Sequence, residues 1–368
     1  MKTTLSHSQI GRYQMCPKSY EYYYIQKLRP KVHSASLVFG SAIDNALNAL
    51  LTGQESPEAL FEKSFRFSKI NNADTYIPTY PDLVYANSDF DSDLLNEDDY
   101  KHLEEQSKKG FIIGSSNYLE LYSELKELKQ KKGFVSLSVD QKKVYNLLNW
   151  LSLKRKGLLM LAAYRKKVLP KIEKVHEVQK RVVLKNNVGD EIVGYVDLVA
   201  DIKDIGTVIL DNKTSSMEYE ENSVLTSPQL TLYMHILEDE YKTRKAGYIV
   251  MRKTVIKNRK KICKACGNDG SGGRHKTCDA LIEGKRCNGE WNETIDPDIY
   301  IQFITDEIPQ QTEDIVMENI DNTNDAIKHG IFTRNFNSCQ NFYGSVCPYF
   351  GKCFKNNEEG LVCEKKKG

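Results

Sequence analysis

Two neighbouring apolar segments that each carry an aspartate constrain the fold of this chain more than any other feature. Residues 191–201 (EIVGYVDLVAD) and 207–213 (TVILDNK) are rich in β-branched residues, which favour strands. The first segment contains Asp197, and the second ends in Asp211 and Lys213. Burying an acid beside apolar residues costs free energy unless a positive group meets it. A surface hairpin would not need this arrangement, so the pattern indicates a strand pair that carries a polar site.

The segments around this pair predict an α/β core. Residues 176–185 (HEVQKRVVLK) alternate and precede a turn signal, which indicates a strand. The order continues as a helix, further strands and a closing helix, predicted at residues 227–241 with Pro228 in the first turn, 246–253, 298–308 and 309–330. The first fifty residues predict helices, with Ser6 and Ser8 as candidate caps and a second helix beginning near Ser36.

Composition and charge limit the class of protein. The chain has 368 residues, 40% of them hydrophobic and 28% charged, enough for one large core with inserted modules. No apolar run reaches the roughly 18 residues of a membrane span, and the N-terminus lacks the apolar stretch of a signal peptide. We therefore expect a cytoplasmic protein without membrane contact. Net charge is only +2, so a nucleic-acid surface must be local. Residues 153–156, 164–167 and 257–261 are candidates, and solvated faces are the alternative.

The two acidic strands predict a cation site. Side chains two apart on a strand share a face, so Asp211 and Lys213 point the same way. If the strands are antiparallel neighbours, Asp197 lies close to Asp211. Paired carboxylates bind hard cations such as Mg²⁺ or Mn²⁺, which can activate water for attack on a phosphodiester. Lys213 can orient that water or neutralise developing charge. An Asp-x-Lys alone also arises from ordinary surface ion pairs; the second aspartate and the QLTLY that follows favour the site.

Together, GYVDLV, ILDNKTS and QLTLYMHIL resemble the RecB-like branch of the PD-(D/E)XK nucleases, which includes AddB-type and CRISPR-associated exonucleases. The resemblance implies a restriction-endonuclease-like α/β core, a mixed central sheet flanked by helices. It implies that Asp197 and Asp211 are metal ligands and that Lys213 is catalytic. Gln229 and Tyr233, one helical turn apart, would face the site and contact DNA or the catalytic residues; a half-buried helix face is the alternative.

An upstream helix completes the site in this family, usually through Gly-x-x-x-His. The matching stretch, FGSAIDNAL, has Gly40 in register and Asp44 where histidine is usual. Aspartate is also a hard-metal ligand, so Asp44 is a candidate for the metal site, with a helix-surface acid as the alternative. Glu177, on the preceding strand, is a further candidate acid.

Four of the nine cysteines form a separate unit. Without an export signal, metal ligation is favoured over disulfides. The Cys-x-x-Cys pair and two later cysteines predict a zinc ribbon of about thirty residues that needs its metal to fold, with the ligands Cys263, Cys266, Cys278 and Cys287. His275 could replace one ligand, but we expect it to be exposed. The neighbouring lysines suggest contact with nucleic acid, and a structural or partner-docking role is equally open.

Four other cysteines lie near the chain ends. Cys16, Cys339, Cys347 and Cys353 resemble the pattern of one N-terminal and three C-terminal cysteines that holds a [4Fe–4S] cluster in several RecB-like nucleases. The gap between Cys339 and Cys347 is wider than in those relatives. Zinc is the alternative. Either group would join the two ends of the chain around the core, with Cys363 as a spare thiol.

These observations predict a metal-dependent DNA nuclease, expected to be an exonuclease on single-stranded or end-containing DNA. The alternative is an inactive DNA-binding or assembly subunit with the same fold. Protein partners in recombination, repair or CRISPR adaptation are compatible with either. The expected organisation comprises N-terminal helices with the first cluster cysteine (1–70), an acidic loop and helical insertion (71–173), the nuclease core (174–255 and 293–335), the zinc ribbon (256–292) and a C-terminal cysteine cluster (336–368).

Overall fold

A computed structural model of the chain describes residues 4–31, 33–54, 56–65, 83–84, 91, 94–95, 139–185, 190–271, 275–340 and 346–364. Of the predicted acidic loop and helical insertion over residues 71–173, the part up to 138 lies outside the described residues, apart from the few positions just given.

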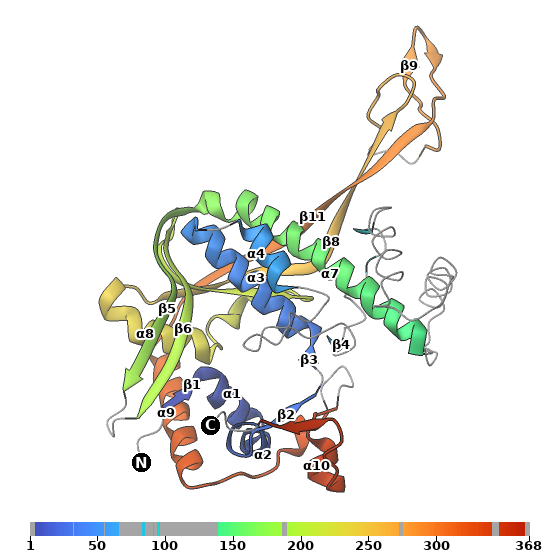
Figure 1. Cartoon of the computed structure of the whole chain (residues 1–368). Helices are drawn as coiled ribbons and strands as arrows, with labels where there is room; N and C mark the ends of the chain where they lie inside the picture. The colour runs from blue at the N-terminus through green and yellow to red at the C-terminus, as the bar shows by residue number, and fades with distance from the viewer. Residues whose placement is uncertain are drawn as a thin grey trace.

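A six-stranded mixed sheet forms the centre of the protein (Figure 1). Its strands are β1 (Thr4–Ser6), β5 (Ile172–Lys185), β6 (Glu191–Ile202), β7 (Gly206–Ser215), β8 (Lys245–Cys263) and β11 (Trp291–Glu307). The sheet has the order β1-β6-β7-β8-β11, and β5 also pairs with β6. The β1–β6 and β7–β8 pairs are parallel, and the other pairs are antiparallel.

Helices cover both faces of this sheet. One hydrophobic core lies between the sheet and α3 (Ala35–Thr52), α4 (Pro57–Ser64) and α7 (Val139–Lys167). A second core lies between the opposite face and α1 (His7–Met15), α8 (Pro228–Tyr241) and α9 (Gln310–Lys328). The predicted α/β fold, a mixed central sheet flanked by helices, is therefore confirmed. The remaining short elements are α2 (Pro17–Tyr20), η1 (Glu21–Ile25), β2 (Leu28–Pro30), β3 (His33–Ser34), β4 (Leu83–Val84), η4 (Leu169–Lys171), η5 (Glu221–Ser223), β9 (Leu281–Ile282), β10 (Lys285–Arg286), η6 (Phe336–Ser338), α10 (Phe350–Lys355) and β12 (Leu361–Cys363).

The N-terminal segment differs in part from the helical prediction. Thr4–Ser6 forms strand β1, which pairs with the first residues of β6 through Leu5 and Ile192. Ser6 then caps α1, and its hydroxyl accepts a hydrogen bond from the Gln9 N–H at 3.2 Å. Because β7 has already left β6 at this level, the exposed edge of β6 needs another partner. Residues Thr4–Ser6 therefore form a strand because β6 lies beside them, and the local sequence does not show this contact.

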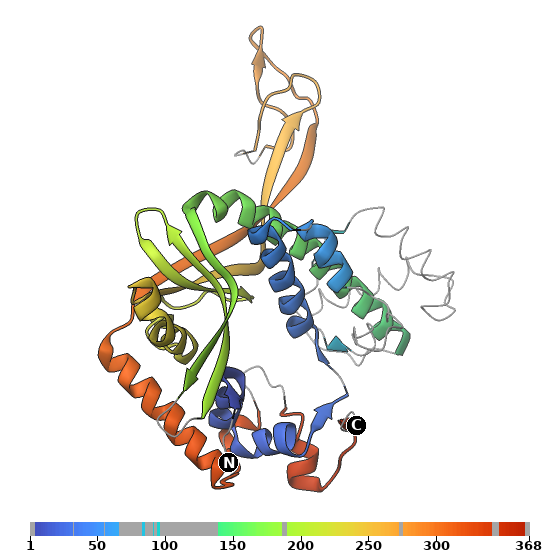
Figure 2. The ribbon, with the colours of Figure 1, turned by 60° about the vertical axis from the view of Figure 1, so that its left-hand side comes forward.

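Strands β8 and β11 continue well beyond the predicted segments and form a two-stranded arm. The pairing runs without interruption from Ile299 and Val255 out to Trp291 and Cys263. Figures 1 and 2 show the arm standing out from the body, with β9 near its far end. The predicted ribbon thus sits at the tip of the arm.

Segments from near the two ends of the chain lie side by side. Strands β2 and β12 pair antiparallel. The buried Tyr349 hydroxyl donates to the carbonyl of Leu28 at 2.9 Å, and Tyr22 packs against the same tyrosine. Over the described part of the chain, every helix is too short or too polar to cross a membrane.

Candidate active site

The predicted acids lie at a fork in the sheet. Strand β6 pairs with β7 only as far as Leu198 and Leu210, and the next residues on the two strands are Asp197 and Asp211. On its other edge, β7 pairs with β8 from Ile209 to Ser215, so this pairing continues past the fork. The backbone N–H of Asn212 is turned toward β6 and donates to Asp197 Oδ2 at 2.8 Å instead of to a strand carbonyl. The end of the ladder therefore places two carboxylates side by side.

Lys213 and Gln229 complete a polar network around Asp211. The carboxylate of Asp211 is almost fully buried, with 2% of its side chain exposed, and forms an ion pair with Lys213. Helix α8 begins with Ser227 as its cap and Pro228 in its first turn, which places Gln229 over the strand. Gln229 Nε2 donates to Asp211 Oδ1 at 3.0 Å, and Lys213 Nζ donates to Gln229 Oε1 at 3.3 Å. The glutamine therefore fixes both partners of the ion pair.

The ring of Tyr233 packs against Gly194. Gln229 Nε2 donates to the Tyr233 hydroxyl at 3.1 Å. A Cβ atom at Gly194 would lie 2.4 Å from Tyr233 Cε1, so the tyrosine ring occupies the space that any other residue would fill. Glycine is therefore needed at this position of the GYVD motif, because a side chain would displace the ring that supports Gln229.

Asp44 joins the site from helix α3. Gln179 Nε2 lies 3.2 and 3.3 Å from the two carboxylate oxygens of Asp44 and 3.1 Å from Asp197 Oδ1. The two acids are far apart in the sequence yet are both held by one amide nitrogen, so they converge. The structure brings together the six residues that the family motifs indicate, which are Asp44, Asp197, Asp211, Lys213, Gln229 and Tyr233.

The structure also identifies residues that the sequence did not single out. Gln179 has a positive φ of 52° within strand β5, and no sequence signal marks this conformation. The candidate acid Glu177 lies elsewhere, because its Oε1 accepts from Lys180 Nζ at 3.3 Å and from the Tyr241 hydroxyl at 3.2 Å. His7, at the start of α1, lies close enough to Lys213 that burial and this charge lower its pKa to about 4.

Burial raises the pKa values of the three acids, and neighbouring negative charges add to this effect at Asp44 and Asp197. Burial, together with the charges of Asp211 and Asp44, raises the pKa of Asp197 to about 7. Burial and Asp211 raise the pKa of Asp44 to about 6. Burial lowers the pKa of Lys213, but the neighbouring Asp211 outweighs this effect, and the net shift is upward. Carboxylates with raised pKa values, grouped as oxygen donors beside one ammonium, fit a hard divalent cation such as Mg²⁺ or Mn²⁺.

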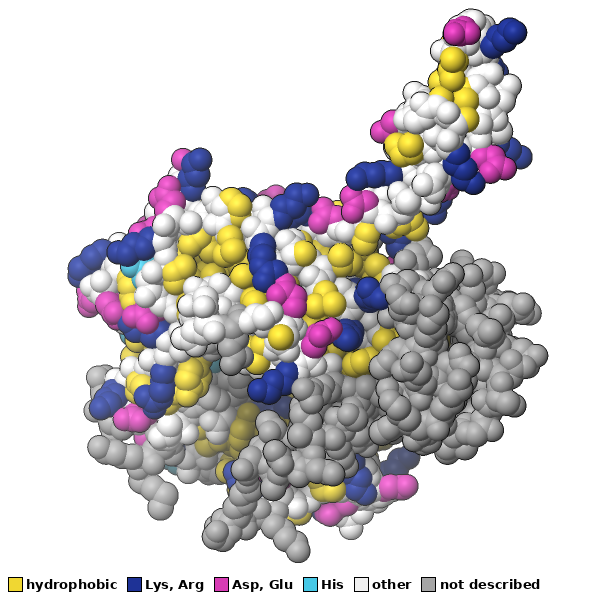
Figure 3. Space-filling model, turned by 45° about the horizontal axis from the view of Figure 1, so that its top comes forward, with side chains coloured by type: hydrophobic (Ala, Val, Ile, Leu, Met, Phe, Trp, Pro, Cys, Tyr) yellow, Lys and Arg dark blue, Asp and Glu magenta, His cyan; other side chains and the backbone are white. Residues whose placement is uncertain are grey.

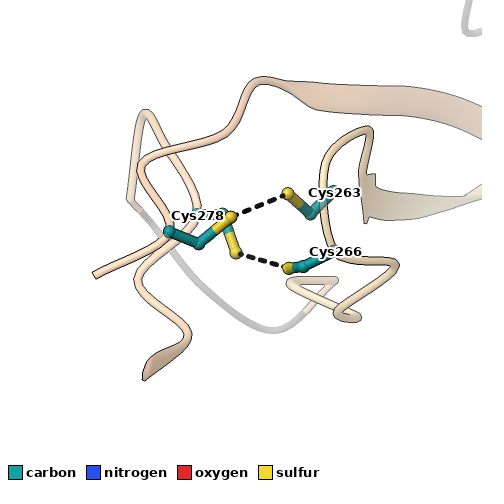
Figure 4. Close-up of side chains that lie close together, drawn as sticks. Cys263, Cys266 and Cys278 are labelled. Atoms are coloured by element: carbon teal, nitrogen blue, oxygen red, sulfur yellow. Dashed lines mark hydrogen bonds between the residues drawn. The ribbon is translucent and has the colours of Figure 1, made fainter. Parts of the chain in front are cut away.

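The ribbon cysteines form a compact group at the tip of the arm. All four sulfur atoms lie within 4.8 Å of one another. The Sγ atoms of Cys263 and Cys287 are 3.6 Å apart, as are those of Cys266 and Cys278, and Figure 4 shows Cys263 and Cys266 facing Cys278. Tetrahedral Zn–S bonds of about 2.3 Å require sulfur separations of roughly 3.8 Å. These four residues therefore fit zinc. His275 instead contacts Asp279 at 3.3 Å.

The four cysteines near the chain ends surround a second, looser centre. Cys16, Cys339, Cys347 and Cys353 line one small cavity of about 20 Å³ between η6, α10 and the start of α2. Burial raises the pKa of the Cys347 thiol, with smaller contributions from the other three sulfurs. Unlike the ribbon cysteines, these four described cysteines do not place three sulfur atoms within 4.8 Å of one another.

The three basic segments singled out in the sequence are engaged in ion pairs. Along the arm, three lysines face acids across the strands, in the pairs Lys260–Asp296, Lys261–Glu293 and Lys264–Glu290 at 3.1, 2.9 and 2.9 Å. Figure 3 shows basic and acidic side chains interspersed along it. In the body, Lys154 pairs with Glu62 and Arg165 with Glu58. These three described lysines are therefore paired with acids across the arm.

Comparison with known families agrees with this fold. The sequence model of the PD-(D/E)XK nuclease superfamily matches residues 116–353. The match covers more than half of the chain, and the chain belongs to this superfamily of nucleases. No curated protein sequence matches significantly.

Two solved structures give weak matches. A candidate exonuclease from Eubacterium rectale has 13% identity and a TM-score of 0.28, over 70% of this chain and 79% of that chain. A structure named SSO0001 has 14% identity and a TM-score of 0.23, over 62% of this chain and 82% of that chain. Similarity at this level adds nothing to the assignment.

Proposed function

We propose that this nuclease is a metal-dependent deoxyribonuclease of the RecB-like branch, and that it acts as an exonuclease on single-stranded DNA or DNA ends. The observation that carries the proposal is the convergence of three acids and one ammonium group at the fork between β6 and β7. The motif order Gly-x-x-Asp, Asp-x-Lys and Gln-x-x-x-Tyr supports the branch.

Each side chain has a defined part in phosphodiester hydrolysis. Asp44, Asp197 and Asp211 would hold Mg²⁺ or Mn²⁺, which supplies Lewis acidity and lowers the pKa of water when it is bound. Lys213 stays protonated beside Asp211 and donates to a phosphate oxygen, so that it neutralises charge developing in the transition state. Gln229 keeps the lysine directed at the site, and Tyr233 keeps Gln229 in place.

The cysteine arrangement supports the same branch. One N-terminal and three C-terminal cysteines line a single cavity, at the place where β2 and β12 join the chain ends. We propose that they hold a [4Fe–4S] cluster and that the ribbon holds zinc. We further propose that the ribbon and the terminal cysteines are modules separate from the nuclease core, and that the arm binds a protein partner or has a structural role.

Digestion assays test the activity and its substrate. End-labelled linear single strands, linear duplex and closed single-stranded circles are incubated with the protein in Mg²⁺ or Mn²⁺. We expect the linear single strands to be degraded and the circles to persist; circles cut as fast as linear strands would contradict the exonuclease assignment.

Variants test the site itself. Asp211→Asn and Lys213→Ala should each reduce kcat about 10²- to 10³-fold or more. Asp201→Asn is the matched control, because Asp201 lies on the same strand as Asp197 but contacts Thr207 and His176. Full activity in both site variants would place the chemistry elsewhere. A parent protein that digests none of the substrates in Mg²⁺ or Mn²⁺ would instead favour the inactive DNA-binding or assembly subunit.

A further inference from the structure

Gln179 has an unusual position in this site. Its neighbours Val178 and Lys180 pair with Leu198 and Val196 of β6, so Gln179 lies opposite Asp197. Its φ of 52° is in the left-handed region, which disfavours residues with a side chain. A non-glycine residue in this conformation persists only when its surroundings hold it there, and such residues concentrate at functional sites.

The side chain of Gln179 explains why this backbone is kept. Its Nε2 donates to both Asp44 and Asp197 at 3.1–3.3 Å. These are the two acids that come from different layers of the protein, one from helix α3 and one from strand β6. Without a positive group between them, their charges would push the helix and the strand apart. The amide therefore holds the two halves of the site together in the ion-free form.

The same contact becomes unfavourable when a cation enters. An amide N–H carries partial positive charge, and it would point at an ion lying between Asp44 and Asp197. A half-turn of the terminal amide exchanges Nε2 for Oε1 without moving the rest of the side chain. The amide oxygen is a hard donor of the kind that Mg²⁺ and Mn²⁺ bind.

We propose that Gln179 is a fourth residue of the cation site: it bridges Asp44 and Asp197 through Nε2 when the site lacks an ion and turns Oε1 toward the ion when one binds. This inference rests on the proposed metal-dependent function. It assigns a ligand role to a residue of strand β5, which supplies none of the motif residues.

Mn²⁺ binding by calorimetry and electron paramagnetic resonance tests the inference without measuring catalysis. The whole protein is first loaded with Zn²⁺ so that the ribbon is filled. Gln179→Met should weaken Mn²⁺ binding by about tenfold or more. Gln179→Glu, which restores an oxygen donor, should bind Mn²⁺ more tightly than the parent. Gln179→Gly accepts the positive φ without strain and should weaken binding as methionine does, so it serves if the methionine variant fails to fold.

Controls separate this inference from the proposed function. Glu177→Gln lies two residues away on β5, with its side chain held by Lys180 and Tyr241, and should bind Mn²⁺ like the parent. If Asp197→Asn also binds like the parent, the cation site and the proposed function both fail. If Asp197→Asn loses Mn²⁺ while Gln179→Met and Gln179→Gly retain it, only the role of Gln179 is overturned. Weakened binding in the methionine, glycine and glutamate variants alike would show a structural contact in place of a ligand.

Discussion

Replacing Asp197 by asparagine should stabilise the ion-free protein at neutral pH. The amide keeps an oxygen that can accept from the Asn212 N–H, as Asp197 does at 2.8 Å. It removes the negative charge that lies beside Asp211 and Asp44. The amide nitrogen then faces Gln179, which donates to Asp197 Oδ1 at 3.1 Å in the parent, and the terminal amide of Gln179 can turn its Oε1 toward this nitrogen. The variant therefore relieves the crowding of the acids at the cost of rearranging one hydrogen bond.

The size of the effect follows from the linkage between protonation and folding. The pKa of Asp197 is about 7 in the folded protein, against about 3.9 in an unfolded chain. Between these values the folded state binds the proton that the unfolded state has lost, so the parent loses stability as pH rises from about 4 through 7. The full difference is about 4 kcal/mol. Since Asp197 is only partly buried, we expect the asparagine variant to be more stable by about 3 kcal/mol at pH 8.

Urea unfolding followed by circular dichroism, at pH 4.5 to 8, measures this difference. Both proteins are loaded with Zn²⁺ and kept in buffer without Mg²⁺ or Mn²⁺. His7, whose lowered pKa has the opposite effect on stability, is present in both proteins, so its contribution cancels. The gap between the two stability curves should open as pH rises. Added Mg²⁺ should stabilise the parent and leave the variant nearly unchanged.

Parallel curves of stability against pH for the parent and Asp197→Asn would refute the reasoning, because they would mean that the pKa of Asp197 is the same in the folded and unfolded states. Equal stabilisation of both proteins by Mg²⁺ would place the cation somewhere else. Asp201→Asn again serves as the control. Its partner His176 lies 2.9 Å away, and hydrogen bonds from Thr207 and His176 lower the pKa of Asp201, so this substitution should not stabilise the protein.

Three further predictions concern the supporting parts of the molecule. Gly194→Ala forces a Cβ against Tyr233; it should cost about 1–3 kcal/mol of stability and lower kcat in the digestion assay, whereas an unchanged kcat would remove Tyr233 from the supporting network. Cys278→Ser should release the ribbon zinc, measured by elemental analysis, while the free energy of unfolding of the core stays within about 1 kcal/mol of the parent value. A core that unfolds when the zinc is lost would show that the ribbon is part of the core. Cys353→Ser should abolish the visible absorption of anaerobically purified protein, and a colourless parent that holds a second zinc would contradict the cluster.

Much of the core could be predicted from the sequence because its signals are local. The alternation of residues 176–185, the β-branched residues of β6 and β7 and the proline at the start of α8 all act over a few residues. The sequence predicts Asp197 close to Asp211 on the condition that the two strands are antiparallel neighbours, which they are. For the same reason, the order of strands, helix, strands and closing helix agrees with the prediction.

The features that were missed depend on contacts between distant segments. Thr4–Ser6 forms a strand only because β6 offers a free edge. Gln179 reaches Asp44 only through a left-handed backbone that no residue pattern marks. The arm extends beyond the predicted strands. Its residues are charged, which is unusual in a buried sheet, but the arm is exposed and lysines on one strand pair with acids on the other. Each of these depends on a partner far away in the sequence.

The aspartate at position 44 and the glutamine at position 179 are best understood together. A histidine in place of Asp44 would be neutral near pH 7 and could ligate a metal without adding charge. Asp44 instead gives the site three acids against the single ammonium of Lys213. In the ion-free protein this excess has to be met by protons or by donors, and Gln179 is the donor that touches both outer acids. The substitution Asp44→His should therefore make Gln179 dispensable for stability in the ion-free form. If Gln179→Met is equally destabilising in the parent and in the Asp44→His background, measured in a double-mutant cycle, the two positions are not coupled through charge.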